Sequence, residues 1–542
     1  MSGDSPGVAG TAPPRRPERI DLRTALAPLA WPRFGALALA IFVTYAYFVA
    51  RPAWNQNSRF ALTRALVEER SPIIDRDHAT TGDKSFRDGH FYCDKAPGLS
   101  ILAVPVYAVF YGLRRLGGGE LPAVEVIPLD PVDLAAERAP PPDRMGPGDR
   151  LRYNPAWRIA TYLCRVGTVV PLALLGLAGL FALAHALARQ RGHEAPRARS
   201  LATWVTLTYA LATPAFPYAT GLYGHRPVAD LLIAAFAFIT LTPPPDPSLG
   251  IRGPSTRELV GLGALLGAAV CIEYPAAPPV AALFGLAWAR FGAKAGLRLV
   301  VAGAPFALGL ALYHAWAFGG PLRTGYDFVY LETFAEGMKV QYGIHRPDPG
   351  AAFEILFGSY RGLFALAPVL IPALWGLTQV DRRIAGTAVA VFAYYLALNA
   401  GYYMWDGGAA IGPRHLLPAL PFLALGLVPF FAAFPRAAAL LALVSGLQML
   451  LATYAGPEAP THGHPLWGWA IFEFTDFGRV GSSSATNLGR FLGLPGPTSL
   501  VPLALAWLAL IPRKRELELT DAPLGGSVPP ARGSAKITAD KR

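Results

Sequence analysis

The sequence is poor in charged residues, in cysteine and in lysine. The first two shortages exclude several classes of protein, and the third draws attention to each lysine that is present. Of the 542 residues only 15% are charged, while 53% are hydrophobic; a soluble domain usually has about 25% charged residues. Three cysteines are too few for a dense disulfide framework, and none has the spacing of a metal site. Disorder, collagen and coiled coil are excluded for most of the length. Lysine occurs 7 times against 41 arginines, so each lysine is worth inspecting.

What the sequence does contain is a series of long apolar runs, with a mean hydropathy of +0.34. The net charge of +12 would suit a nucleic-acid-binding protein if the basic residues formed one patch. They are instead dispersed between apolar blocks, so we expect no nucleic acid as a partner. The predicted fold class is an all-α polytopic membrane protein.

The apolar runs predict about 12 transmembrane helices, with both ends of the chain in the cytoplasm. Residues 1–33 and 516–542 are predicted to be disordered cytoplasmic tails, and no secretory cleavage site follows the first of them. Arginine and lysine recur in the loops that this topology places inside, as the positive-inside rule requires. The predicted spans are 34–50, 166–187, 200–217, 226–242, 259–273, 276–289, 299–318, 363–379, 384–400, 415–434, 437–454 and 497–512.

The first loop, residues 51–158, is predicted to be large and external. Its one apolar segment, Leu99–Tyr111, is short for a span; if it crossed, the arginines of 189–199 would face outside. We therefore interpret it as a juxtamembrane helix. Helical spacing of apolar residues in Ser58–Arg70 predicts a second, amphipathic helix lying on the membrane. The chain divides into a transmembrane module of residues 34–320 and a second of residues 321–515, whose external loops are 319–362, 401–414 and 455–496.

The loops on the outer face collect the unusual residues and make that face the natural place for a site. Asp94 and Lys95 precede Pro97-Gly98, where the Leu99–Tyr111 helix begins. Backbone N–H groups at a helix N-terminus favour an anion, and a lysine adds a point charge for phosphate. The alternative is an Asp N-cap with a lysine that reaches the lipid headgroups.

Each of the other candidate site residues has both a functional and an ordinary structural interpretation. His225, at the start of a span, could position or protonate a substrate, or it could cap its helix. Glu273 lies near the end of a span, where an ionisable residue suggests a functional site. Its side chain could also simply reach the water at the outer surface. Asp406 lies among tyrosines and glycines that could bind a sugar or form an aromatic belt. Arg414 and His415 begin a helix, where positive charge opposes the dipole and a bound anion would resolve the conflict.

Part of the sequence resembles the GT-C glycosyltransferases that use polyprenyl-phosphate sugars, above all the lipid A aminoarabinose transferases and more distantly the protein O-mannosyltransferases. The resemblance covers residues 34–320 in layout, which would make this part a GT-C-like catalytic module. It lies in the helix from Ser58 to Leu66, the Asp94-Lys95-Ala96-Pro97 element, Arg165 at the opening of the next span, and the basic inner loop Arg189–Arg199.

One departure concerns the acid that the family places just before the amphipathic helix, where it is thought to activate the acceptor. Here that stretch reads Trp54-Asn55-Gln56-Asn57. Asp75 is the best replacement as the base, with Asp77 second, and this transfer of role is our own inference. Glycosyl transfer needs a carboxylate for the acceptor proton, and cations for the charge that grows on the leaving phosphate.

The resulting site prediction has two parts. The catalytic carboxylates are Asp75, Asp77 and Asp94. The residues expected to bind substrate or phosphate are Lys95, Arg165, His225, Arg361, Asp406, Arg414 and His415, with Lys95 and Arg414 as the first choices. No metal ligand is assigned; no cofactor is certain, and a divalent metal is left open.

The predicted function is that of a multi-pass enzyme of a bacterial inner membrane. It would move a sugar from a polyprenyl-phosphate donor to a lipid, glycan or protein acceptor on the outer, periplasmic face, surrounded by membrane lipids. The alternative is a transporter or flippase for a lipid-linked saccharide, which would have charged or broken helices near the middle of the membrane.

Overall fold

The structure of the chain, a computed structural model, describes residues 27–128, 149–461, 463–475 and 486–510. The predicted disordered tails lie outside the described residues, except for a short 3-10 helix and the first residues of α2 between positions 27 and 33. The described part is mainly helical, with three small two-stranded sheets.

Each predicted span falls on one helix or on a set of short consecutive helices. The single helices are α2 (Pro32–Tyr47), α6 (Pro155–Gln190), α7 (Ala195–Leu211), α9 (His225–Leu241), α10 (Thr256–Ile272), α11 (Ala277–Phe291), α12 (Ala293–Phe318), α17 (Arg382–Gly401), α20 (Pro435–Ala455) and α23 (Val501–Leu510). The broken ones are α15 (Leu363–Leu366) with α16 (Ile371–Leu377), and the 3-10 helix η8 (Arg414–Ala419) with α18 (Leu420–Ala424) and α19 (Leu427–Ala433).

Within the described residues, five helices have the length and composition to cross a membrane, namely α4 (Gly98–Leu116), α6, α12, α17 and α20. A sixth span results if 414–424 and 427–433 count as one, with a bend of 52° between them. Pro32–Tyr47, Pro368–Leu377 and Gly496–Leu510 are shorter apolar helices. The total of about 12 spans stays a prediction. The helix α4 is also longer than the predicted Leu99–Tyr111 segment, so its length alone does not keep it out of the membrane.

The long helices pack around α6, which contacts α7 and α9 along much of its length. On α9, the Arg226 guanidinium donates to Asp230 at 2.7 Å, and both side chains are fully buried. Gly176 of α6 makes this possible, because a Cβ there would lie 2.4 Å from an oxygen of Asp230. The buried pair is therefore part of the helix packing.

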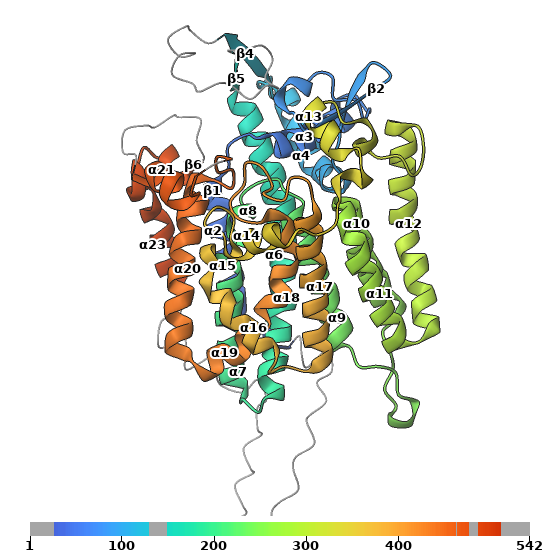
Figure 1. Cartoon of the computed structure of the whole chain (residues 1–542), viewed down its shortest axis with the longest axis vertical. Helices are drawn as coiled ribbons and strands as arrows, with labels where there is room; N and C mark the ends of the chain where they lie inside the picture. Colours follow the sequence, from blue (N-terminus) through green and yellow to red (C-terminus); the bar gives the residue numbers. More distant parts are fainter. Residues whose placement is uncertain (1–26, 129–148, 462, 476–485, 511–542) are drawn as a thin grey trace, which may run out of the picture.

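Most of the loop 51–158 gathers at one end of the helices, together with α13 (Glu332–Met338) (Figure 1). It contains α3 (Trp54–Glu68), α4 and two hairpins, β2 (Lys84–Arg87) with β3 (His90–Cys93) and β4 (Val124–Pro128) with β5 (Asp149–Tyr153). The third sheet pairs β1 (Phe48–Val49) with β6 (Thr486–Asn487), joining the two ends of the described chain. The remaining short helices are α8 (Ala215–Tyr218), α14 (Pro349–Phe357), α21 (Ile471–Thr475) and α22 (Leu488–Phe491).

The helix predicted at Ser58–Arg70 is present as α3, but it does not have the exposed polar face of a surface helix. Every residue from Asn55 to Ala65 is buried, including Arg59 and Arg64. Partners from other segments satisfy these polar groups, as buried polar side chains require. The expected exposed polar face is therefore not present, while the position of this helix at the membrane surface stays a prediction.

Candidate functional site

A β-hairpin builds the first part of the site by bringing together residues that flank it. The register pairs Lys84 with Cys93, so the residue before β2 and the residues after β3 become neighbours. The turn is Asp88-Gly89, both with positive φ, as a tight hairpin turn requires. Lys95 Nζ consequently lies 3.3 Å from Asp83 Oδ2 and 3.0 Å from Asp94 Oδ2.

Asp83, Asp94 and Lys95 form a triad, which we call the Lys95 triad. Burial and charge together set the pKa values of Lys95 and Asp94. Burial alone would lower the pKa of Lys95, but Asp83 and Asp94 outweigh it and hold the pKa well above the ordinary 10.5. The Asp94 side chain is 6% exposed, and burial raises its pKa to about 6 although Lys95 opposes the rise. The second oxygen of Asp94, Oδ1, is buried and has no hydrogen-bond partner. Asp94 is thus a carboxylate that takes up a proton easily and has one free oxygen.

A second group forms where α3, α9 and the end of α10 meet. Glu273 accepts from Arg59 Nη2 at 3.3 Å, and its other oxygen lies 2.5 Å from His225 Nδ1. Gly224 leaves room for this carboxylate, because a Cβ would lie 2.4 Å from Glu273 Oε1 and would displace the side chain. Glu273 is therefore a fixed carboxylate that holds a histidine.

Arg414 and His415 link the two groups. The His415 ring lies 5.1 Å from the His225 ring and 5.5 Å from the Tyr402 ring, measured between centroids. His415 is an electrostatic neighbour of Lys95, and Arg414 is one of Asp83. Arg414 Nε and His415 Nε2 are buried and have no hydrogen-bond partner. Because a buried N–H group without an acceptor is costly, Arg414 Nε is suited to an anion, and His415 Nε2 is suited to one in the tautomer that places the proton on this nitrogen.

Aromatic and acidic side chains border the site. Tyr402 and Tyr326 are electrostatic neighbours of Lys95, and burial raises the pKa of each to about 12. On another side, the Tyr223 hydroxyl donates to Glu458 Oε1. Tyr402 also lines a cavity of about 410 Å³ with Tyr403, Trp405, His345, Arg346 and Asp348. Lys95, Asp94 and Arg414 do not line this cavity, and Tyr402 is a residue that it shares with the surroundings of Lys95.

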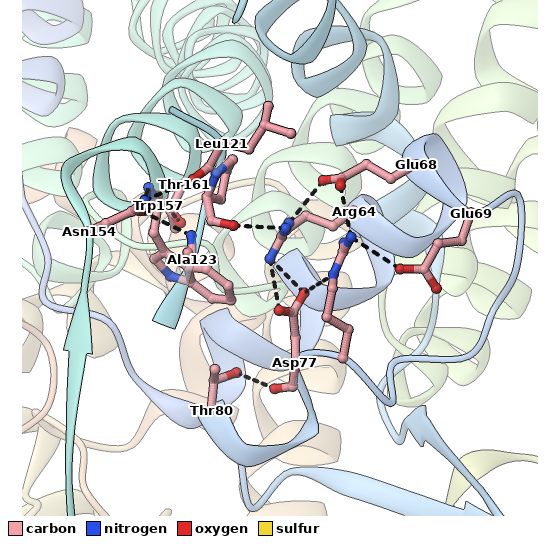
Figure 2. Close-up of polar contacts among 12 residues, drawn as sticks. Arg64, Glu68, Glu69, Asp77, Thr80, Leu121, Ala123, Asn154, Trp157 and Thr161 are labelled. Carbon is pink, nitrogen blue, oxygen red and sulfur yellow. Dashed lines mark hydrogen bonds and ion pairs between the residues drawn. The ribbon is translucent and has the colours of Figure 1, made fainter. Parts of the chain in front are cut away.

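Asp77 belongs to a different cluster, which Figure 2 shows. Arg64 Nη1 donates to both carboxylate oxygens of Asp77 at 2.8 Å, while Arg64 Nε donates to Glu68 at 3.1 Å. Arg76 adds an ion pair with Glu68 at 2.9 Å. The cluster ties α3 to the segment that follows it, so the contacts of Asp77 are structural.

Asp75 lies at the surface with 43% of its side chain exposed. One oxygen lies 2.7 Å from His90 Nδ1 and the other accepts from the Phe91 N–H at 2.6 Å. These bonds fasten the preceding loop to strand β3. Neither Asp75 nor Asp77 makes a contact with the Lys95 triad, so the structure does not bring the two first-choice bases to the phosphate-binding candidates.

Two other predicted residues, Arg165 and Arg361, donate hydrogen bonds to backbone carbonyls, and a third, Asp406, supplies one of these carbonyls. Arg165 donates to Tyr45 O and Phe48 O, both at 2.6 Å, and so closes the end of α2. Arg361 donates to Asp406 O at 2.9 Å and to Gly408 O at 2.6 Å, which fixes the 401–414 loop. The contact of Asp406 with Arg361 is made by its main chain. Arg361 positions the loop that precedes Arg414.

The structure therefore unites Asp94, Lys95, His225, Arg414 and His415 from the predicted set. It adds Asp83 and Arg59, which the sequence reasoning did not single out, and Glu273, which it considered but left out. The Asp-Gly turn between alternating strand residues was the signal that could have found Asp83. In the described ranges, no three His, Cys, Asp or Glu side chains converge in a way that could hold a metal ion.

No family model and no curated protein matches the chain. Two solved structures, both of ArnT from Cupriavidus metallidurans, are similar to it at 14% identity. The one bound to undecaprenyl phosphate has a TM-score of 0.43 and the alignment covers 78% of this chain and 63% of that chain. The apo structure has a TM-score of 0.40, with 75% and 60% covered. This chain thus spans about three fifths of the length of those proteins.

Proposed function

We propose that the chain is a GT-C-like integral membrane glycosyltransferase of a bacterial inner membrane. It transfers a sugar from a polyprenyl-phosphate donor to a lipid, glycan or protein acceptor on the outer face, with both termini in the cytoplasm. One observation carries the proposal: Lys95, with 18% of its side chain exposed, lies between two carboxylates and near Arg414 Nε and His415 Nε2, two buried nitrogens without a hydrogen-bond partner. The resemblance of the Asp94-Lys95-Ala96-Pro97 element to the GT-C enzymes supports it.

Cations of this site suit the leaving group of the reaction. When the sugar–phosphate bond breaks, negative charge grows on the lipid phosphate, and donors already in place stabilise it most in a site shielded from water. Lys95, Arg414 and His415 would bind this phosphate. Lys95 precedes α4, the helix that begins at Gly98, so the N–H groups of its first turn add to the attraction.

Asp94 is the carboxylate best suited to accept the proton of the acceptor hydroxyl or amine. A general base works best when its pKa lies near the working pH, and burial brings that of Asp94 to about 6. Oδ2 is held by Lys95, whereas Oδ1 is free to accept the proton. Glu273 would keep His225 and Arg59 in place around the substrate. This assignment replaces Asp75 as the proposed base.

The transporter or flippase alternative has one observation in its favour, the 52° bend between 414–424 and 427–433. Broken helices of this kind can line a translocation path. The two functions differ in whether the sugar–phosphate bond is broken.

The test is a transfer assay with the full chain reconstituted in liposomes that contain a polyprenyl-phosphate-linked sugar. Release of the polyprenyl phosphate and appearance of the sugar on an acceptor are both measured. Lys95→Met should lower the rate by about 100- to 1,000-fold, since it removes one placed donor. Lys339→Met is the control, because the Lys339 side chain is 71% exposed and outside the site. Movement of the donor across the bilayer without bond cleavage would contradict the proposal and favour the flippase.

A further inference from the structure

A second pocket lies between the start of α2 and the first turns of α7. Its volume is about 240 Å³, and its lining includes Trp31, Arg33, Arg199, Ser200, Thr203 and Trp204. In Figure 1 α7 lies at the end of the helices opposite to α3, α4 and α13. The pocket is therefore remote from the Lys95 triad, on the side that the arginine-rich loops predict to be cytoplasmic.

The pocket carries positive charge and no acid. Arg33 and Arg199 each lie against the indole ring of Trp31, with guanidinium carbons 5.2 and 5.7 Å from its centroid. None of the residues that line the pocket is Asp or Glu. The guanidinium of Arg199 beside this ring supplies the charge that would attract an anion.

Two hydrogen-bond donors in this pocket lack acceptors. Arg199 Nε and the indole Nε1 of Trp31 are both buried without a hydrogen-bond partner. A buried N–H group of this kind normally has an acceptor, and the shortfall costs free energy. Arg199 and Ser200 also lie in the second turn of α7, which begins at Ala195, so the N-terminal N–H groups of that helix favour an anion nearby.

The pocket also opens onto apolar helix surface. Trp204, on its rim, is 52% exposed, and Leu207, one turn further along α7, completes the lining. Tryptophan is enriched at the level of lipid headgroups, with apolar residues toward the bilayer core. A ligand with an anionic head and an apolar tail fits this arrangement better than a free ion does.

We propose that this pocket binds the phosphate group of an anionic phospholipid. Arg199 and Trp31 donate hydrogen bonds to the phosphate oxygens, Arg33 contributes charge, and the acyl chains lie along Trp204 and Leu207. The site is separate from the transfer site and does not depend on the proposed enzymatic function.

The experiment uses the purified full chain in detergent, titrated with phosphatidylglycerol, with phosphatidylcholine or with inorganic phosphate. Bound lipid is counted by native mass spectrometry. We expect phosphatidylglycerol to bind in preference to phosphatidylcholine. Arg199→Gln should weaken the binding of phosphatidylglycerol by about 10- to 100-fold, which corresponds to the loss of one charge-assisted hydrogen bond. Arg197→Gln is the matched control, because Arg197 is exposed on the same helix and does not line the pocket.

A second variant, Trp31→Phe, separates the loss of a hydrogen bond from a loss of folding. It keeps an aromatic ring and removes the indole N–H. It should weaken phosphatidylglycerol binding while the protein stays folded. Equal binding of the two lipids would overturn the proposal, as would an unchanged affinity in Arg199→Gln. Displacement of the lipid by millimolar inorganic phosphate would show that the ligand is a soluble phosphate and would also overturn it.

Discussion

Replacing Asp94 by asparagine should raise the free energy of unfolding of the protein. Its ordinary pKa is 3.8 and burial raises it to about 6. One pKa unit corresponds to about 1.4 kcal/mol, so at pH 7 the ionised side chain lowers the free energy of unfolding by about 3 kcal/mol. Asparagine has the same shape without the charge. Since an amide is a weaker acceptor for Lys95 than a carboxylate is, we expect a net gain of about 1–3 kcal/mol for Asp94→Asn.

The assay is thermal unfolding in detergent, followed by the fluorescence of the 11 tryptophans. At pH 7.5 the unfolding temperature of Asp94→Asn should lie a few degrees above that of the unchanged chain. The same variant should lose glycosyl transfer by about 100- to 10,000-fold, because the proton acceptor is gone. Higher stability with lower activity separates a functional carboxylate from a structural one.

The pH dependence has a definite sign. Below about pH 4 Asp94 is protonated in both the folded and the unfolded chain and has no effect. Between about pH 4 and 6 the unfolded chain releases the proton first, so stability falls as the pH rises, and above pH 6 the loss is complete. Lowering the pH from 7.5 to 5 should therefore remove roughly half of the cost of ionised Asp94, about 1.4 kcal/mol, and lowering it to about pH 4 should remove most of it.

Asp88→Asn is the control, because Asp88 lies in the turn of the same hairpin with 71% of its side chain exposed. Its left-handed backbone conformation suits asparagine as well as aspartate. The control should alter neither stability nor its pH dependence. A lower unfolding temperature for Asp94→Asn at pH 7.5 would refute the reasoning, because it would mean that the ion pair with Lys95 outweighs the cost of burial.

Three further predictions concern residues outside the triad. Asp230→Asn should lower stability by about 3–5 kcal/mol, measured by thermal unfolding, because it leaves Arg226 fully buried without its charge partner. Gly224→Ala should reduce turnover in the transfer assay while the protein still folds, since the new methyl group displaces Glu273. Asp75→Asn should keep full transfer activity and change stability by no more than about 0.5 kcal/mol, because this exposed carboxylate lies outside the site.

The helices could be predicted from the sequence because lipid imposes a strong and local constraint. Every backbone polar group in a bilayer must be satisfied within its own segment, so a long apolar run signals a helix by itself. The described residues of the predicted spans lie mainly in helices for that reason. The interruptions within 363–379 and 415–434 were missed, since hydropathy does not register prolines such as Pro368 and Pro418 that end or bend a helix.

The site could be predicted only where its residues are neighbours in sequence. Asp94-Lys95 and Arg414-His415 were found because each pair stands at a helix start. The pairing of Arg59 with Glu273 spans 214 residues, and no local pattern reports a contact at that distance. The burial of the polar face of α3 was missed for the same reason. The spacing of apolar residues predicted an exposed polar face, whereas carboxylates from distant segments and from the following loop bury Arg59 and Arg64.

The balance of charge explains how so many ionisable groups are buried together. Three cations of the site each face a carboxylate: Arg59 faces Glu273, Lys95 faces Asp83 and Asp94, and Arg414 has Asp83 as an electrostatic neighbour. With neutral histidines the group is close to neutral, which keeps its burial tolerable. A phosphate that enters adds negative charge next to Asp94, so a proton on that residue becomes easier to hold. The acceptor's proton would thus pass to the carboxylate whose protonation the bound phosphate already favours.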